Sequence, residues 1–198
     1  MSTIMSTITT PKRVGPAPAV AKVSVATVWL DGCSGCHMSF LDLDQRLVEL
    51  ASRIDMVYSP LVDRKDFPEE VVLTIVEGSV STNEEVEKIK KIRKHTKILL
   101  SLGDCAVTGN VPAMRNKFGT EATYDRAYMQ KENVTVQPQV PRMKLPVLLD
   151  RVRPVHEVVK VDVFVPGCPP PADAIYQVLM DLLDGKTPNI GALTRFGR

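Results

Sequence analysis

Five apolar runs recur along the chain, and each is followed by a turn that contains glycine or proline. They cover residues 23–30, 54–58, 71–76, 97–102 and 158–165. Short runs rich in β-branched residues are typical of strands. The near-continuous hydrophobicity of VVLTIV at 71–76 is typical of a parallel strand that is covered on both faces. The pattern therefore predicts five strands.

Helical periodicity follows several of these runs. It predicts a helix over residues 37–52, a second helix capped by Ser81 or Thr82, and a last helix over 172–183 that Gly185 ends. The apolar side of the first helix is expected to hold Phe40, Leu41, Leu43, Leu47, Val48 and Leu50. Strands that alternate with helices predict the α/β class, here a three-layer flavodoxin-like domain with a mostly parallel five-stranded sheet.

Two irregular stretches set the expected domain boundaries. Residues 1–21 are rich in Ser, Thr, Pro and Ala without periodicity, and we expect a flexible N-terminal arm there. Residues 22–198 are expected to form a single flavodoxin-like domain with one core. Within it, residues 110–157 contain scattered prolines and are expected to be an irregular insertion, with a short helix near 112–118.

Composition narrows the class of protein. The chain of 198 residues is 44% hydrophobic and 24% charged, with a formal net charge of +2 at pH 7. This small charge, without a basic stripe interleaved with aromatic residues, does not predict a nucleic-acid partner. No apolar run reaches the about 18 residues of a membrane span, and residues 1–20 lack the pattern of a secretory or twin-arginine signal. We therefore expect a cytoplasmic protein.

Four cysteines carry the candidate chemistry. Cys33 and Cys36 follow the first predicted strand, Cys105 the fourth and Cys168 the fifth, and each lies beside glycine or proline. In a reducing compartment, such cysteines are more often metal ligands or redox thiols than disulfide partners. Because the carboxyl ends of parallel strands share one edge of a sheet, the four thiolates are expected to converge. A four-sulfur site suits either zinc or an iron–sulfur cluster.

The spacing of the cysteines favours the iron–sulfur cluster. Structural zinc sites usually combine two close pairs, whereas this chain has one close pair, Cys33 and Cys36, and two single cysteines. A proline after a ligand cysteine, as after Cys168, is also typical of ferredoxin runs. Zinc stays an alternative. So does a thioredoxin-type dithiol at the close pair, although it leaves Cys105 and Cys168 unexplained.

The motifs around the cysteines read WLDGCSGCHMSFLD, SLGDCAVTGNVPAMRN and VDVFVPGCPPPADAIYQVL, with VEGSV between the first two. Together they resemble the cluster-bearing small subunit of nickel–iron hydrogenases, most closely the short form found in soluble, NAD-linked bidirectional enzymes. The resemblance covers residues 23–185. The related complex I subunit carries adjacent cysteines in its first motif, whereas two residues separate Cys33 from Cys36 here. This difference favours the hydrogenase family.

The resemblance implies that Cys33, Cys36, Cys105 and Cys168 ligate one proximal [4Fe-4S] cluster. The nickel–iron site of the family needs four cysteines of its own, so it is expected on a large-subunit partner, and no catalytic residue is expected here. The implied function is an electron relay from that hydrogen-oxidising site to flavin and iron–sulfur diaphorase subunits that reduce NAD. The alternatives are a complex I-like quinone-linked relay and a non-redox binding subunit with a structural four-cysteine zinc.

Glu77 and His37 lie beside the expected cysteine edge. The resemblance suggests a carboxylate near the large-subunit interface at Glu77, with either a proton-route or a hydrogen-bonding role. His37 follows Cys36 and either hydrogen-bonds near the cluster or lies at a helix start or an interface. A flavodoxin-like edge can also hold FMN, but the sequence has no phosphate loop distinct from the cysteine turn, so FMN in this chain is not favoured.

Overall fold

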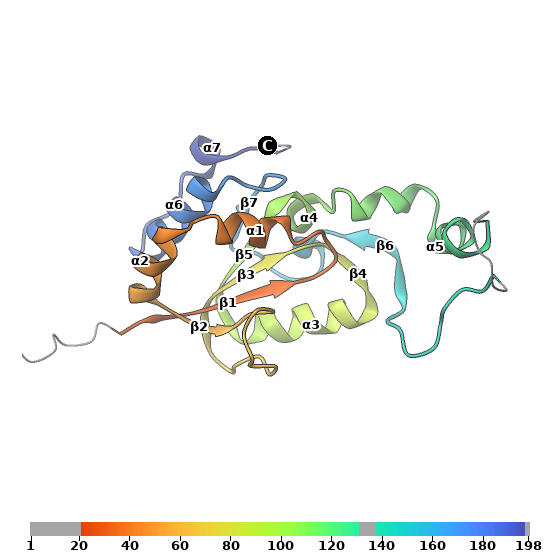
Figure 1. The fold of residues 1–198 in the computed structure, drawn as a ribbon, viewed down its shortest axis with the longest axis horizontal. Coiled ribbons are helices and arrows are strands. Elements are labelled where there is room, and N and C mark those ends of the chain that lie inside the picture. The colour runs from red at the N-terminus through yellow and green to blue at the C-terminus, as the bar shows by residue number, and fades with distance from the viewer. Residues whose placement is uncertain (1–20, 131–137, 197–198) are drawn as a thin grey trace, which may run out of the picture.

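The computed structural model describes residues 21–130 and 138–196, and at its centre lies a five-stranded parallel sheet (Figure 1). Its strands are β1 (Val23–Trp29), β2 (Ile54–Tyr58), β3 (Val71–Glu77), β5 (Thr96–Leu102) and β7 (Val163–Val165). They lie in the order β2-β1-β3-β5-β7, and every neighbouring pair is parallel. This is the flavodoxin-like strand order, so the predicted fold class is confirmed. The N-terminal arm expected over 1–21 falls outside the described residues, apart from residue 21.

Helices cover both faces of the sheet and give the domain three layers. In Figure 1, α1 (Gly35–Leu41), α2 (Gln45–Arg53) and α6 (Ala172–Leu183) lie on one side of the sheet, and α3 (Asn83–Lys94) lies on the other. The short helix α7 (Ile190–Leu193) packs against the first group. The first core includes Val25, Phe40, Leu50, Leu73, Leu100 and Ile175, and the second includes Val28, Val76, Ile89, Ile92 and Leu99.

The helix expected over 37–52 is two helices. The chain turns between α1 and α2, where Leu43 enters the core with 1% of its surface exposed and Asp44 has a positive φ of 51°. Because α2 starts anew after this turn, its buried side is set by Leu47 and Leu50. The expectation that Leu41 and Val48 face the core was wrong, since they are 45% and 77% exposed.

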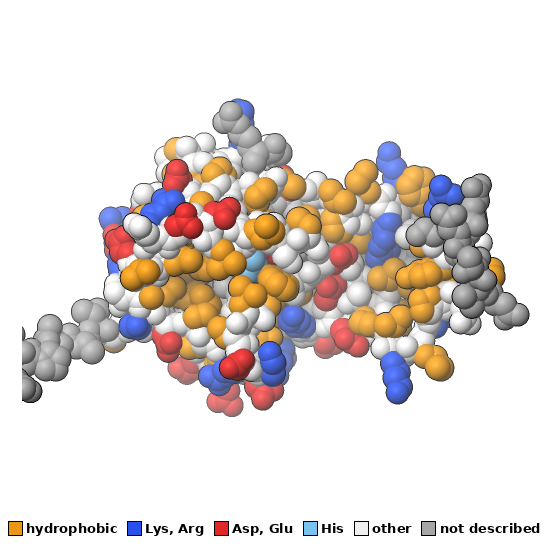
Figure 2. Space-filling view, viewed as in Figure 1, with side chains coloured by type: hydrophobic (Ala, Val, Ile, Leu, Met, Phe, Trp, Pro, Cys, Tyr) orange, Lys and Arg blue, Asp and Glu red, His pale blue; other side chains and the backbone are white. Residues whose placement is uncertain are grey.

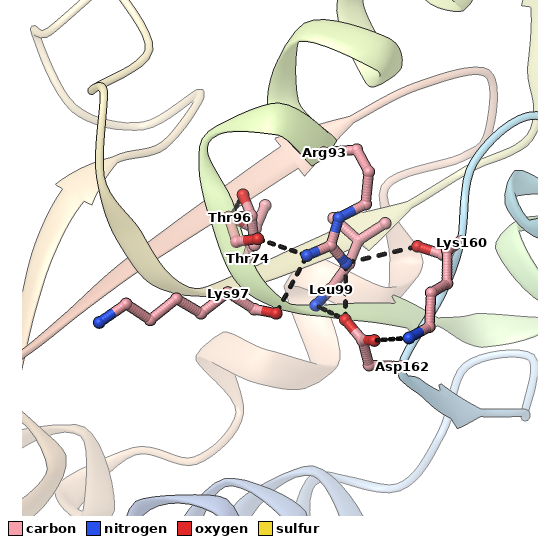
Figure 3. Close-up of polar contacts among 7 residues, drawn as sticks. All are labelled: Thr74, Arg93, Thr96, Lys97, Leu99, Lys160 and Asp162. Atoms are coloured by element: carbon pink, nitrogen blue, oxygen red, sulfur yellow. Dashed lines mark hydrogen bonds and ion pairs between the residues drawn. The ribbon is translucent and has the colours of Figure 1, made fainter.

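The last strand also starts later than expected, at Val163 rather than residue 158. The carboxylate of Asp162 accepts the backbone N–H of Leu99 at 2.8 Å, and the N–H of Asp162 donates to the Leu99 carbonyl at 2.9 Å. Arg93, from the end of α3, donates to the same carboxylate at 2.6 Å (Figure 3). A side chain therefore takes the place of a backbone partner where β7 joins β5.

Helix α3 begins as the sequence predicted. Thr82 accepts the N–H of Glu85, and the Glu85 carboxylate accepts the N–H of Thr82, which forms a capping box. Just before it, β4 (Val80–Thr82) pairs with β6 (Leu148–Arg153) in a second, antiparallel sheet of two strands.

Residues 110–130 and 138–157 carry this β6 strand and several short helices to one side of the domain (Figure 1). The helical segments are η1 (Pro112–Lys117), α5 (Thr120–Tyr124), η2 (Asp125–Met129) and η3 (Val155–Glu157). Asn116 ties η1 to β6, because its amide donates to the Val152 carbonyl at 2.9 Å and accepts the Val152 N–H at 2.8 Å. Across the described parts of the chain, no helix is long and apolar enough to cross a membrane.

Candidate metal centre

The four cysteines predicted as ligands lie together at the carboxyl edge of the parallel sheet. Cys33 and Cys36 lie in the turn after β1 and the start of α1, Cys105 in α4 (Gly103–Thr108) directly after β5, and Cys168 in the turn after β7. All four line one cavity of about 100 Å³ and are free thiols. One ordered water needs only about 10–15 Å³ of such volume, so the cavity is wider than a single small ligand requires.

Glycine allows these turns to approach one another. Gly103 has a φ of +84°, and a Cβ built on it would lie 2.2 Å from the Cys36 sulfur. Gly78, after β3, has a φ of +87°, and its Cβ would lie 2.7 Å from the carbonyl carbon of Leu30. A side chain at either position would push the cysteine turn away from its neighbour, so the space at the cavity depends on both glycines.

A buried carboxylate, Asp104, joins the two turns that carry the single cysteines. Its side chain is 7% exposed and accepts the Gly167 N–H at 2.7 Å, while its own N–H donates to the Gly167 carbonyl at 2.8 Å. Helix α1 is tied to the same turn, because the Ser39 hydroxyl donates to the Pro170 carbonyl at 2.6 Å. Sequence reasoning missed both residues, although Asp104 stands directly before a cysteine.

A second buried carboxylate, Glu77, joins the end of β3 to the turn of the close cysteine pair. One of its oxygens, Oε2, lies 2.7 Å from the His37 N–H and 2.7 Å from the His37 ring Nδ1. Glu77 is 3% and His37 4% exposed, and the Trp29 ring stands edge-on to the imidazole at 5.3 Å. These contacts show hydrogen bonding for both residues, and His37 also lies at the start of α1, the other position considered for it from the sequence.

Two of the thiols, Cys36 and Cys105, resist ionisation without a positive partner. Burial raises the pKa of Cys36, and the negative charge of Glu77 adds to the effect. Burial likewise raises the pKa of Cys105 to about 11, followed by the charges of Cys33 and Cys168, although a hydrogen bond from Asn110 opposes the rise. A bound cation that neutralises the thiolates would remove this penalty, so the site is electrostatically suited to a metal centre.

The sulfurs surround a cavity rather than a point. Among the described residues, no three His, Cys, Asp or Glu side chains converge closely enough to hold one metal ion. A zinc site needs each sulfur at about 2.3 Å from the same ion. The zinc alternative would therefore require the cysteine turns to move closer together than they lie here.

A larger cavity of about 540 Å³ lies between η1 and the helices α5 and η2, away from the cysteines in sequence. It is mostly apolar, with two arginines at its walls, and its lining residues are Met114, Arg115, Phe118, Ala122, Thr123, Arg126 and Ala127. No cysteine lines it, so it is distinct from the candidate metal centre.

Comparison with known proteins agrees with this combination of fold and site. The chain belongs to the family described as the NADH ubiquinone oxidoreductase, 20 Kd subunit, whose model matches residues 33–182. Within the family, the similarity to hydrogenase small subunits expected from the sequence is confirmed by named relatives. The chain is 43% identical over 173 residues to the NAD-reducing hydrogenase HoxS subunit delta of Cupriavidus necator, covering 83% of this chain and 80% of that one.

Other relatives extend the comparison. The chain is 36% identical over 168 residues to one subunit of the F420-non-reducing hydrogenase of Methanothermobacter marburgensis, but spans only 54% of its length. A crystal structure of an NAD+-reducing [NiFe]-hydrogenase in the H2-reduced state contains a chain with 39% identity and a TM-score of 0.85, matched over 89% of this chain and 99% of that one. A [NiFeSe]-hydrogenase from Dm. baculatum, at 18% identity and a TM-score of 0.53, shares the fold.

Proposed function

We propose that Cys33, Cys36, Cys105 and Cys168 hold one [4Fe-4S] cluster, and that this chain is the electron-transfer small subunit of an NAD-reducing nickel–iron hydrogenase. Electrons would pass from a nickel–iron site on a large-subunit partner, through this chain, to flavin and iron–sulfur subunits that reduce NAD. The observation that carries the proposal is the convergence of all four cysteines on one cavity. The names of the similar proteins support it, since they include an NAD-reducing hydrogenase and an iron–sulfur subunit.

The donor set fits such a cluster. Four thiolates are the ligands that a cubane cluster takes, and soft sulfur donors suit iron–sulfur centres. The cavity leaves space between the sulfurs because Gly103 lacks a Cβ at the position nearest Cys36. When bound, the cluster supplies one-electron transfer without general acid or base chemistry.

The chain's own residues perform the supporting tasks. The four cysteines would bind the cluster. Asp104 and Glu77 hold the ligand-bearing turns together, and the Asn110 side-chain amide nitrogen lies 3.5 Å from the Cys168 sulfur. Hydrogen bonds to sulfur and exclusion of water are the means by which a protein tunes the potential of such a centre.

The surface around the cavity supports a partner subunit. Cys33 and Cys168 are exposed, and apolar side chains flank them: Met38 on α1 is 64% exposed, and Val111, next to Asn110, is 62% exposed. Figure 2 shows hydrophobic side chains gathered over the helices beside the sheet and over the segment of residues 110–130 and 138–157 that lies to one side of the domain. Exposed apolar patches of this kind mark protein interfaces. We assign the patch around the cavity, which includes Met38 and Val111, to contact with the large subunit. A cytoplasmic location is part of the same proposal.

A quinone-linked relay of the complex I type is the second candidate, because the matching family model is described by an NADH ubiquinone oxidoreductase subunit. The two-residue spacing of Cys33 and Cys36 and the 43% identity to a hydrogenase subunit favour the first candidate. Nickel in a complex co-purified with this chain would support hydrogenase, and its absence together with quinone reduction would support the second candidate.

Anaerobic purification of the complex, followed by iron, sulfide and zinc analysis and by EPR of the dithionite-reduced sample, tests the cluster directly. We expect four irons for this chain's site and a broad visible band that dithionite bleaches. The Cys168→Ala variant should lose this signal and hydrogen-dependent NAD reduction together, whereas NADH oxidation by the flavin module should persist. Zinc in place of iron, or unchanged hydrogen-to-NAD turnover in the variant, would overturn the proposal.

A further inference from the structure

Strand β3 ends at the candidate metal centre without supplying a cysteine. It lies between β1 and β5, whose following turns carry Cys33, Cys36 and Cys105. Its last residue, Glu77, lines the same cavity as the four thiols and is 3% exposed. Burying a carboxylate to this degree costs free energy unless hydrogen bonds or an opposite charge compensate for the lost water.

The hydrogen bonds of Glu77 are directed at the turn of the close cysteine pair. A single oxygen, Oε2, accepts the backbone N–H of His37 at 2.7 Å and lies 2.7 Å from its ring Nδ1. The backbone and the side chain of the residue next to Cys36 are thus both fixed to the end of β3. The edge-on contact of the imidazole with Trp29 at 5.3 Å restricts the ring further.

The charge of this carboxylate also reaches the ligand sulfur. Glu77 lines the cavity together with Cys36 and is almost completely shielded from solvent, so its charge acts on that sulfur with little screening. A negative charge inside a site of low dielectric disfavours the addition of an electron nearby, because the two negative charges repel each other. The carboxylate therefore has both a geometric and an electrostatic effect at the same sulfur.

We propose that Glu77 is a positioning residue for the proposed cluster: through His37 it fixes the turn that carries Cys36, and its charge lowers the midpoint potential of the site. This inference rests on the proposed function. It assigns separate roles to the geometry and to the charge of one side chain, and two substitutions separate them.

Glu77→Gln removes the charge, while the amide oxygen has two lone pairs and can accept both contacts from His37. Glu77→Ala removes the charge and both contacts. Glu70→Gln is the matched control, because Glu70 is an exposed glutamate beside the opposite end of the same strand. Each variant is purified as the whole complex, its iron content is measured, and its cluster is titrated with EPR detection over a range of potentials.

We expect Glu77→Gln to keep the iron content and EPR line shape of the wild type but to shift the midpoint potential in the positive direction. Glu77→Ala should show the same positive shift together with an altered or broadened EPR spectrum, and Glu70→Gln should show neither. Wild-type potentials in both Glu77 variants would overturn the inference and leave the proposed function intact. Loss of iron in Glu77→Gln would assign Glu77 a role in folding alone and would also overturn it. A wild-type complex without a cluster would instead refute the proposed function.

Discussion

Asp104 and Gly167 hold each other through two hydrogen bonds, one from each backbone N–H, at 2.8 and 2.7 Å. The pair joins the turn after β5 to the turn after β7, and so fixes Cys105 relative to Cys168. The contact connects residues that are 63 positions apart in the chain. It involves no cysteine, because it uses only backbone groups and one buried carboxylate.

Replacement of Asp104 by Ala should therefore weaken both the fold and the site. The buried Gly167 N–H would lose its acceptor, which costs about 1–3 kcal/mol in the free energy of unfolding. Asp104→Asn retains an acceptor oxygen and should lose much less. Chemical denaturation and iron content of the two variants check this, and equal losses in both would show that the hydrogen bond is not the cause.

Gly103→Ala should impair the site by a direct collision. The added Cβ would lie 2.2 Å from the Cys36 sulfur at a φ of +84°. Gly119→Ala is the control, because Gly119 has a similar φ of +79° with open space around it, and only the backbone cost of about 1–3 kcal/mol applies. Iron per chain should fall in Gly103→Ala and stay near the wild-type value in Gly119→Ala. Equal iron contents would contradict the packing argument.

The Asp162 carboxylate should stabilise the fold in a pH-dependent way. Burial raises the pKa of this group, but the hydrogen bonds from Leu99 and Arg93 outweigh burial and hold the pKa below its ordinary value of 3.8. The stabilisation is therefore complete above that ordinary value and is lost as the pH falls through the lowered one.

Asp162→Asn should accordingly lower the free energy of unfolding by up to about 1 kcal/mol at neutral pH, because the amide oxygen can still accept the Leu99 N–H and only the charge pairing with Arg93 is lost. The difference from wild type should shrink as denaturation is repeated toward pH 3. Asp55→Asn, at an exposed position on β2, should stay within about 0.5 kcal/mol of wild type. A difference that does not change with pH would show that the charge of Asp162 is not involved.

The thiols should differ in reactivity when metal is withheld. Cys33 and Cys168 are exposed, whereas Cys36 and Cys105 are partly buried and have raised pKa values. Iodoacetamide at pH 8 should therefore modify the exposed pair first, and modification of Cys105 should accelerate as the pH approaches 11, because only the thiolate reacts. Peptide mass spectrometry resolves the four sites, and equal rates at pH 8 would disprove this order.

The convergence of the cysteines could be predicted from the sequence because it follows from parallel strands alone. Strands whose hydrophobic runs are continuous must be covered on both faces, and their carboxyl ends then share one edge. Cys105 and Cys168, 63 residues apart, could be assigned to that edge without knowing any contact between them. The same reasoning identified Glu77 as a residue of that edge, but not its partner.

Other features depend on contacts that no local pattern records. Nothing in the sequence marks the turn before Asp44, since Leu43 continues the helical apolar spacing and no glycine or proline interrupts it. The shortening of β7 depends on Arg93 and Asp162, which are brought together only when α3 packs beside the sheet. Strand β6 was missed because the exposed pair Asp150 and Arg151 interrupts its apolar pattern, and its partner β4 has only three residues.

The strand order determines where the cavity of the candidate metal centre lies in the sheet. After β1 the chain leaves through α1 and α2, and after β3 it leaves through α3 on the opposite face, so the two connections diverge beyond the paired residues Asp31 and Ser79. Such a divergence opens a crevice in any doubly wound sheet, whatever residues line it. The strand order thus supplies the recess, and the side chains on the turns after β1, β5 and β7 decide what it can hold.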